Sequence, residues 1–77
     1  MSGREETRMP IYLAPLHVDF VIKEISGDDK LRTHLQNLGF MEGEHIMLVN
    51  KVSENVIVKI KGVSVAISKE LAKRIMV

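Results

Sequence analysis

Three histidines are the side chains of this sequence best suited to acid–base or metal chemistry, and their spacing favours neither. His17, His34 and His45 lie far apart in the chain, and no two form the i, i+3 or i, i+4 pair that presents two ligands from one helix. The fold can still bring each one to a carboxylate, for example His45 to Glu42 or Glu44. We therefore expect structural or solvent-facing histidines, and we predict neither a metal site nor a cofactor.

The remaining polar residues give no catalytic set. Asp28 and Asp29 stand directly before a helix-like pattern, where capping of the helix explains them. Gly39 and Gly43 lack the following Gly-Lys-Ser/Thr of a phosphate-binding loop. The absence of cysteine excludes thiolate ligands and cysteine nucleophiles. The sequence therefore predicts a protein that is not an enzyme.

The length and net charge of the chain further restrict the class of protein. A chain of 77 residues fits one domain with one modest core. Its 11 basic and 10 acidic residues are interspersed and leave a net charge of +1, which creates no strong field for a phosphate backbone. A nucleic-acid partner is therefore not expected.

Hydrophobicity gives no membrane or export signal. No apolar run approaches the roughly 20 residues that a spanning helix needs, and the N-terminal MSGREETRM lacks the apolar segment of a signal peptide. We expect a cytoplasmic protein without direct membrane insertion. Residues 1–8 are polar and patternless and predict a flexible arm, followed by a single domain over residues 9–77.

The stretch between Leu31 and Leu48 organises the predicted fold. Apolar residues recur there at helical spacing, which predicts an amphipathic helix at about residues 28–38. Gly39 is expected in the left-handed position after the helix, so that Phe40 packs back on Leu35 in a Schellman ending. Residues 41–44 then read as a tight turn into a strand.

Strand patterns surround this helix. Pro10 and Pro15 suggest an extended lead-in with a bend, and residues 18–25 predict one strand that is bulged or buried on both sides. Further strands are expected at about residues 45–52, 55–61 and 63–67, then a helical turn at about 69–74 capped by Ser68, and an edge strand at 75–77. Alternation predicts the inward positions: Val56, Val58 and Ile60 in the strand at 55–61, and Val63, Val65 and Ile67 in the strand at 63–67. Short strands at this spacing favour an all-β small barrel with short helices.

Apolar residues at the helix exit are the best functional candidates. Leu38, Phe40, Met41 and Met47 cluster there, and either core packing or contact with a partner explains them. Met41 is the strongest candidate for an exposed contact residue, because a large apolar side chain in a polar turn is harder to bury. We predict that a partner is bound by four residues, Leu35, Leu38, Phe40 and Met41. Two glycines, Gly39 and Gly43, are expected to hold the backbone geometry of this site. Lys51, Lys59 and Lys61 suggest a basic strip, although a solvated outer face is the usual explanation.

The ordered motifs resemble one known family. The run ISGDDKLRTHLQNLGFMEGEHIMLV, followed by VIVKIKGVSVAISKELAKRIMV, is similar to the ferrous iron transport protein A (FeoA) family over about residues 10–77. Members show a glycine before the helix, a Leu-Gly-apolar-x-x-Gly turn, a glycine hairpin, a short helix with Glu and Ala, and a closing Ile-x-Val. The matching positions are Gly27, Leu38, Gly39, Phe40, Gly43, Gly62, Ala66, Ile67, Glu70, Ala72, Ile75 and Val77.

This resemblance implies an SH3-like barrel with a helix inserted after the first strand. It also implies a small cytosolic partner of the FeoB ferrous-iron transporter, acting by protein–protein contact on the transporter's cytosolic GTP-binding part. Two positions depart from the family. Many members have a Pro- and Gly-containing loop where this chain has the short SENV segment, and His17 stands where glycine is common.

Other functions stay open at this point. A related barrel forms the C-terminal domain of iron-dependent repressors, so a regulatory module that binds a peptide or a metal-sensing domain is the alternative. An upstream DNA-binding domain would favour it, and the sequence shows none, so we expect a free-standing module. An RNA-binding barrel would need a basic, aromatic face, and one Tyr with two Phe argue against it. Self-association through the same apolar surface would give a homo-oligomer.

Overall fold

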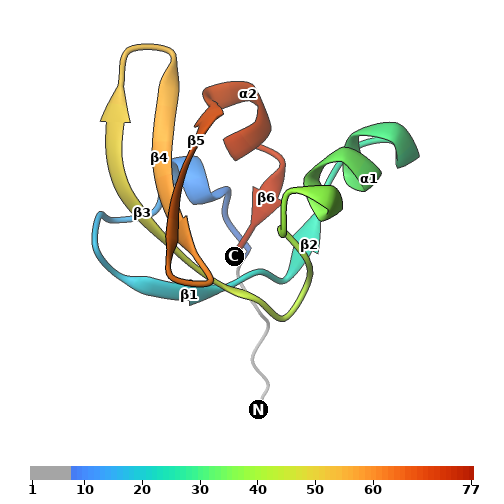
Figure 1. Ribbon diagram of the computed structural model, residues 1–77, viewed down its shortest axis with the longest axis horizontal. Helices are drawn as coiled ribbons and strands as arrows, with labels where there is room; N and C mark the ends of the chain where they lie inside the picture. Colours follow the sequence, from blue (N-terminus) through green and yellow to red (C-terminus); the bar gives the residue numbers. More distant parts are fainter. Residues whose placement is uncertain (1–7) are drawn as a thin grey trace.

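The computed structural model describes residues 8–77 as a small β domain with short helices (Figure 1). The predicted arm at residues 1–8 therefore lies, except for Arg8, outside the described residues. In chain order the elements are η1 (Ile11–Leu13), β1 (Asp19–Val21), β2 (Glu24–Ile25), α1 (Asp29–Asn37), β3 (His45–Val52), β4 (Asn55–Ile60), β5 (Val63–Ser68), α2 (Lys69–Ala72) and β6 (Ile75–Met76). The predicted class, mostly β with short helices, is confirmed.

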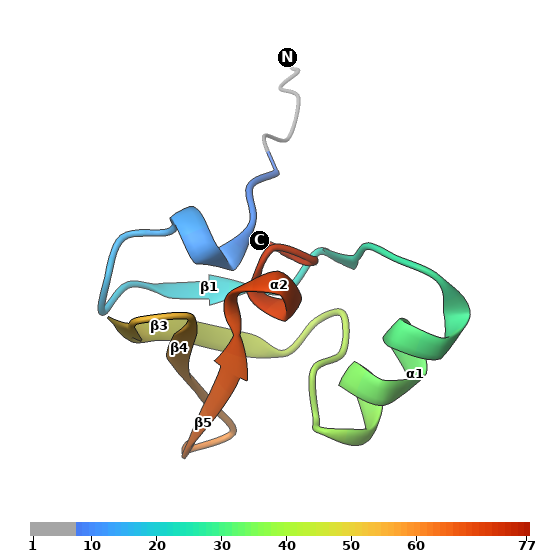
Figure 2. The ribbon, with the colours of Figure 1, turned by 90° about the horizontal axis from the view of Figure 1, so that it is seen from above.

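Two antiparallel sheets build the domain. One has four strands in the order β1-β3-β4-β5, and the other pairs β2 with β6. Viewed from above, the strands curl around α2 while α1 projects to one side (Figure 2). A two-residue turn joins β4 to β5, with φ of +53° at Lys61 and +79° at Gly62, which is the pair of positive φ values that a type I′ hairpin needs.

The single strand predicted over residues 18–25 is wrong. The chain pairs with β3 through β1 and then crosses to the other sheet as β2. Ile22 lies at the crossing: its N–H donates to the Glu44 carbonyl at 2.9 Å, and its own carbonyl accepts from the Gly43 N–H at 2.9 Å. The switch of sheets explains why apolar residues occur on both sides of this segment.

The two ends of the domain also differ from prediction. Instead of an extended lead-in, η1 forms a 3₁₀ turn directly after Pro10, a place where the fixed φ of proline is tolerated. Its first residue, Ile11, is fully buried. The last strand is not an edge, because β6 pairs with β2 on one side and with Pro10 on the other. Met9 and Val77 add two backbone hydrogen bonds of 3.1 and 2.8 Å.

The helix α1 has the predicted caps. The Asp28 carboxylate accepts a 2.9 Å hydrogen bond from the Leu31 N–H. At the other end Gly39 has φ of +100°, the Phe40 N–H donates to the Leu35 carbonyl, and the Gly39 N–H donates to the Gln36 carbonyl, both at 2.9 Å. These are the two hydrogen bonds of a Schellman ending.

The second helix is shorter than predicted. Ser68 caps it, since its Oγ accepts from the Leu71 N–H at 3.2 Å. The helix α2 ends at Ala72. Lys69, the first residue of α2, contacts the β3–β4 turn, since its Nζ lies 2.9 Å from the Glu54 carboxylate. This hydrogen bond raises the pKa of Lys69.

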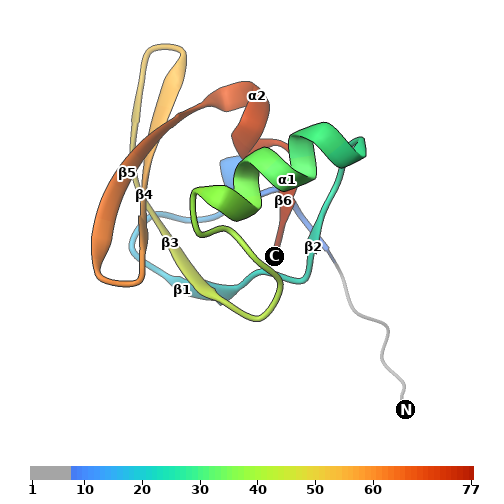
Figure 3. The same cartoon turned by 45° about the vertical axis from the view of Figure 1, so that its right-hand side comes forward.

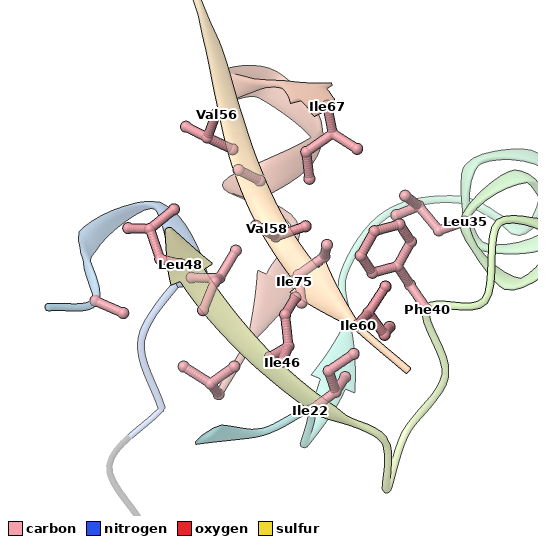
Figure 4. Close-up of a cluster of buried hydrophobic side chains, with 14 of the residues drawn as sticks. Ile22, Leu35, Phe40, Ile46, Leu48, Val56, Val58, Ile60, Ile67 and Ile75 are labelled. Carbon is pink, nitrogen blue, oxygen red and sulfur yellow. The ribbon is translucent and has the colours of Figure 1, made fainter. Parts of the chain in front are cut away.

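The core fills the space between the two sheets, η1 and the helices (Figure 4). Inward residues of β4 follow the predicted alternation, and Val56, Val58 and Ile60 are buried. The alternation fails at the start of β5, where Val63 is 58% exposed at the hairpin tip. The remaining buried apolar residues are Ile11, Ala14, Ile22, Ile25, Leu35, Phe40, Ile46, Leu48, Ile67, Ala72, Ile75 and Val77.

Gly39→Ala tests the helix ending. A Cβ at Gly39 would meet nothing within 4 Å, so the cost comes from the positive φ alone, and we expect a loss of about 1 kcal/mol in the free energy of unfolding. Urea denaturation measures it, with Gln36→Ala on the exposed face of α1 as the control that should change little. An unchanged melting temperature for Gly39→Ala would show that the backbone does not end the helix in this way.

His17→Gly tests a position that departs from the family. His17 has φ of +64° and its N–H donates to the Leu48 carbonyl at 2.8 Å, so a side chain is held in a backbone region that favours glycine. We expect glycine to raise the free energy of unfolding by about 0.5 to 1 kcal/mol. The control is His34→Gly within α1, which should lower stability by roughly 0.3 to 0.5 kcal/mol. An equal loss of stability in both variants would contradict the left-handed backbone conformation at His17.

Candidate functional site

The turn after α1 is held rigidly from both sides. The Schellman hydrogen bonds fix Gly39 and Phe40 to the helix, and Phe40 is fully buried. Beyond it, the Glu44 N–H donates to the Met41 carbonyl at 3.1 Å, and Ile22 is hydrogen-bonded to both Gly43 and Glu44. Gly43 has φ of +93°, a conformation that favours glycine. Residues 38–44 are therefore a well-supported platform for the side chains that project from it.

The structure divides the predicted partner-binding residues into two pairs. Leu35 and Phe40 have no exposed surface, so they cannot supply contacts to a partner while the domain is folded. Their burial has a physical reason, because the apolar contact of the Schellman ending is here part of the core (Figure 4). Leu38 and Met41 are 43% and 42% exposed. We call this pair the helix-exit surface.

A polar groove of about 410 Å³ adjoins the helix-exit surface. Glu42, the neighbour of Met41, forms part of its wall, and Arg32 of α1 and Lys23 face it from the helix and from the crossing between the sheets. The rest of the lining is Arg8, Glu24, Ile25, Ser26 and Gly27. Arg8 and Glu24 pair with each other at 2.6 Å. A partner on the helix-exit surface would thus meet apolar side chains bordered by charges of both signs.

The sequence suggested Glu42 or Glu44 as the carboxylate partner of His45, and this prediction is wrong. His45 Nδ1 lies 2.7 Å from Asp19 Oδ2, across the β1–β3 pair, and not beside Glu42 or Glu44. Both side chains are exposed. The sequence could have shown this only through the register of β1 on β3, which brings two distant segments together. Among the described residues, no three His, Asp or Glu side chains are grouped as metal ligands would be.

Two of the three lysines suggested as a basic strip, Lys51 and Lys61, contact different partners. Lys51 Nζ lies 4.5 Å from the centre of the Tyr12 ring, and Lys73 approaches the same ring at 5.6 Å. Lys61 instead pairs with Glu44 at 3.7 Å. These contacts with different partners fit a solvated outer face.

The fold and the site together define a class of protein. The domain is a small SH3-like barrel that carries an inserted helix, and the turn after that helix exposes the apolar side chains of Leu38 and Met41. Within the described residues, no helix is both long and apolar enough to cross a membrane. A model of the FeoA domain family matches residues 9–77. The chain belongs to the FeoA family, whose proteins are linked to ferrous iron transport and are not known as enzymes.

Solved structures support this assignment. A crystal structure of FeoA, described as an iron uptake regulatory protein, is 25% identical with a TM-score of 0.81, and the match covers 91% of this chain and 95% of that one. FeoA from Stenotrophomonas maltophilia, solved with zinc and described as an SH3 domain protein, is 27% identical with a TM-score of 0.74, covering 87% and 86%. The SH3-like prediction is thereby confirmed. No curated protein matches the sequence significantly.

A repressor shares the fold alone. A manganese-dependent transcriptional repressor aligns with a TM-score of 0.84 over 96% of this chain, but at 13% identity and over 42% of its own length. The barrel was expected in iron-dependent repressors, and the repressor that matches depends on manganese and resembles this chain in fold alone.

Leu35→Ala and Leu38→Ala, seven and ten residues after Asp28, test the division between core and surface. We expect Leu35→Ala to lower the free energy of unfolding by about 3 kcal/mol, because it leaves a cavity in the core, and Leu38→Ala by less than about 1 kcal/mol. Urea denaturation of both variants measures the difference. Equal losses would mean that Leu38 belongs to the core and does not offer a free surface.

Proposed function

We propose that this protein is a small cytoplasmic accessory protein of ferrous iron uptake that binds the cytosolic part of a FeoB-type transporter. The family match supports the link to ferrous iron transport. The observation that supports the proposed contact is the exposure of Leu38 and Met41 on a turn held by hydrogen bonds. The protein acts by binding and not by catalysis.

The physical properties of the helix-exit surface suit a protein partner. Leu38 and Met41 project from a backbone that is already ordered by its hydrogen bonds to α1 and to Ile22, so little backbone conformational entropy is lost when a partner covers them. Methionine adapts its shape to an apolar pocket. Contact at this turn therefore gains apolar burial at a small cost in backbone ordering.

The bordering charges suit orientation of the partner. Arg32, Lys23 and Glu42 line the adjacent polar groove, where charges at the rim of an interface set the approach and register more than the affinity. The proposed interface thus has an apolar centre at the helix exit and a charged margin along the groove.

A regulatory module is the second candidate. The likeness to the manganese-dependent repressor favours it, since the same barrel occurs there within a longer protein. In that case the barrel would bind a peptide or a metal-sensing domain. The second candidate rests on fold alone, whereas the family match favours iron transport.

Met41→Asp tests the proposed contact. Titration of the protein against the cytosolic part of a FeoB transporter from the same source should show saturable binding, and Met41→Asp should weaken it by about tenfold or more, because a charge would be buried against an apolar pocket. Titrations with and without guanine nucleotide would identify the transporter state that is recognised.

The matched control is Val52→Asp. Val52 is 50% exposed at the far end of β3, so the same change there should leave the affinity unchanged. Both variants should keep the melting temperature of the parent, because neither side chain is in the core. An unaltered affinity for Met41→Asp would remove the helix exit from the site, and absence of binding in every nucleotide state would argue against the cytosolic part as the partner.

A further inference from the structure

The strand β5 is an open edge of the four-stranded sheet. It pairs with β4 alone, in the register from Asn55↔Ser68 to Ile60↔Val63. Figure 3 shows β5 at the left margin of the domain and α1 in front, towards the right. Within residues 8–77, no backbone group outside β4 is hydrogen-bonded to Ser64, Val65 or Ala66.

The register shows which backbone groups of β5 are unpaired. A two-residue turn closes on a hydrogen-bonded pair, here Ile60 and Val63. Hydrogen-bonded and non-hydrogen-bonded pairs then alternate along an antiparallel ladder, so Val65 bonds to β4 while Ser64 and Ala66 do not. The N–H and C=O groups of Ser64 and Ala66 therefore point away from the sheet, and both residues are exposed.

This edge lacks the features that usually prevent strand pairing. Native sheets protect their edges with charged residues, proline, bulges or very short strands. The six residues of β5, VSVAIS, contain no charge and no proline, and their ladder with β4 has no register shift. The opposite edge strand, β1, has three residues and carries Asp19. Only β5 is thus both long and unprotected among the strands of this sheet.

We propose that β5 is a dimerisation edge that pairs antiparallel with β5 of a second copy of this chain, about a two-fold axis at Val65. In this register Ser64 of each copy exchanges backbone hydrogen bonds with Ala66 of the other, which satisfies the outward groups of both. Such an isologous contact is self-complementary. The proposal concerns a different surface from the helix exit and does not depend on the proposed function.

The side chains favour a second copy as the occupant. Val65 would lie opposite Val65, and the exposed Val63 would lie beside Ile67 of the other copy, so one apolar stripe would continue across both sheets. On the outer face Ser64 would meet Ala66, and both side chains are small. No like charges oppose each other, because β5 carries none.

Charged residues flank both ends of β5 and have partners within the same copy. Lys59 and Lys61 lie beside its start, and Lys61 is partly balanced by Glu44. Glu70 follows its end, next to the Lys69–Glu54 pair. In the register about Val65, Lys61 of one copy lies opposite Lys69 of the other, and each lysine is balanced within its own copy, by Glu44 and by Glu54. A single short edge buries little surface, so we expect a weak dimer that dissociates on dilution.

Sedimentation equilibrium of the full chain over a wide concentration range tests the dimer. We expect a monomer–dimer equilibrium that Ala66→Pro weakens by about tenfold or more, because proline removes the outward N–H and leaves the bonds of Val65 to β4 intact. Ala66→Lys should weaken it as well, since lysine protects sheet edges. Val21→Lys on the opposite edge is the control and should leave the equilibrium unchanged. Thermal unfolding would verify that each variant remains folded.

Amide hydrogen exchange locates the contact. The amides of Ser64 and Ala66 should exchange rapidly in dilute solution and slowly at concentrations where the dimer forms, while the amide of Val65, bonded to β4, should be protected at both. A monomer at every concentration would overturn the proposal. So would a dimer that leaves these two amides unprotected, or protection of the amides by added transporter domain alone, which would assign the edge to another partner.

Discussion

The burial of Phe40 against Leu35 is the contact on which the arrangement of the inserted helix depends. Both side chains are fully enclosed in the core, and the backbone bond between the same two residues ends the helix. One short segment therefore stops α1, fastens it to the barrel and directs the chain towards β3. Because Phe40 turns inward, its neighbours Leu38 and Met41 are left outside, and the exposed pair is a consequence of the buried one.

Features that depend on nearby residues were predictable from the sequence. The Asp28 cap, the Schellman ending at Gly39 and the Lys61-Gly62 hairpin each involve residues within a few positions of one another, so local chemistry specifies them. The alternation along β4 also predicted its buried face. The family resemblance supplied the SH3-like arrangement, which local patterns support but do not by themselves assemble.

Features that depend on distant segments were not predictable in the same way. The crossing at Ile22, the pairing of β6 with both β2 and Pro10, and the Asp19–His45 contact all require the register between segments far apart in the chain. The same limit explains the error at the site. A helical spacing shows that Leu35 and Leu38 share a face, but only the position of the barrel decides which of them is covered.

The helix-exit surface and the edge of β5 use different chemistry and need not compete. The first offers side chains, Leu38 and Met41, on a turn that hydrogen bonds hold in place, whereas the second offers the unpaired backbone of Ser64 and Ala66. A dimer formed through β5 would leave both helix-exit surfaces open and would present two of them. Two linked sites raise the effective concentration of the second contact once the first is made. A weak dimer would therefore strengthen attachment to a partner that itself carries more than one copy of the recognised segment, without any change at the helix exit.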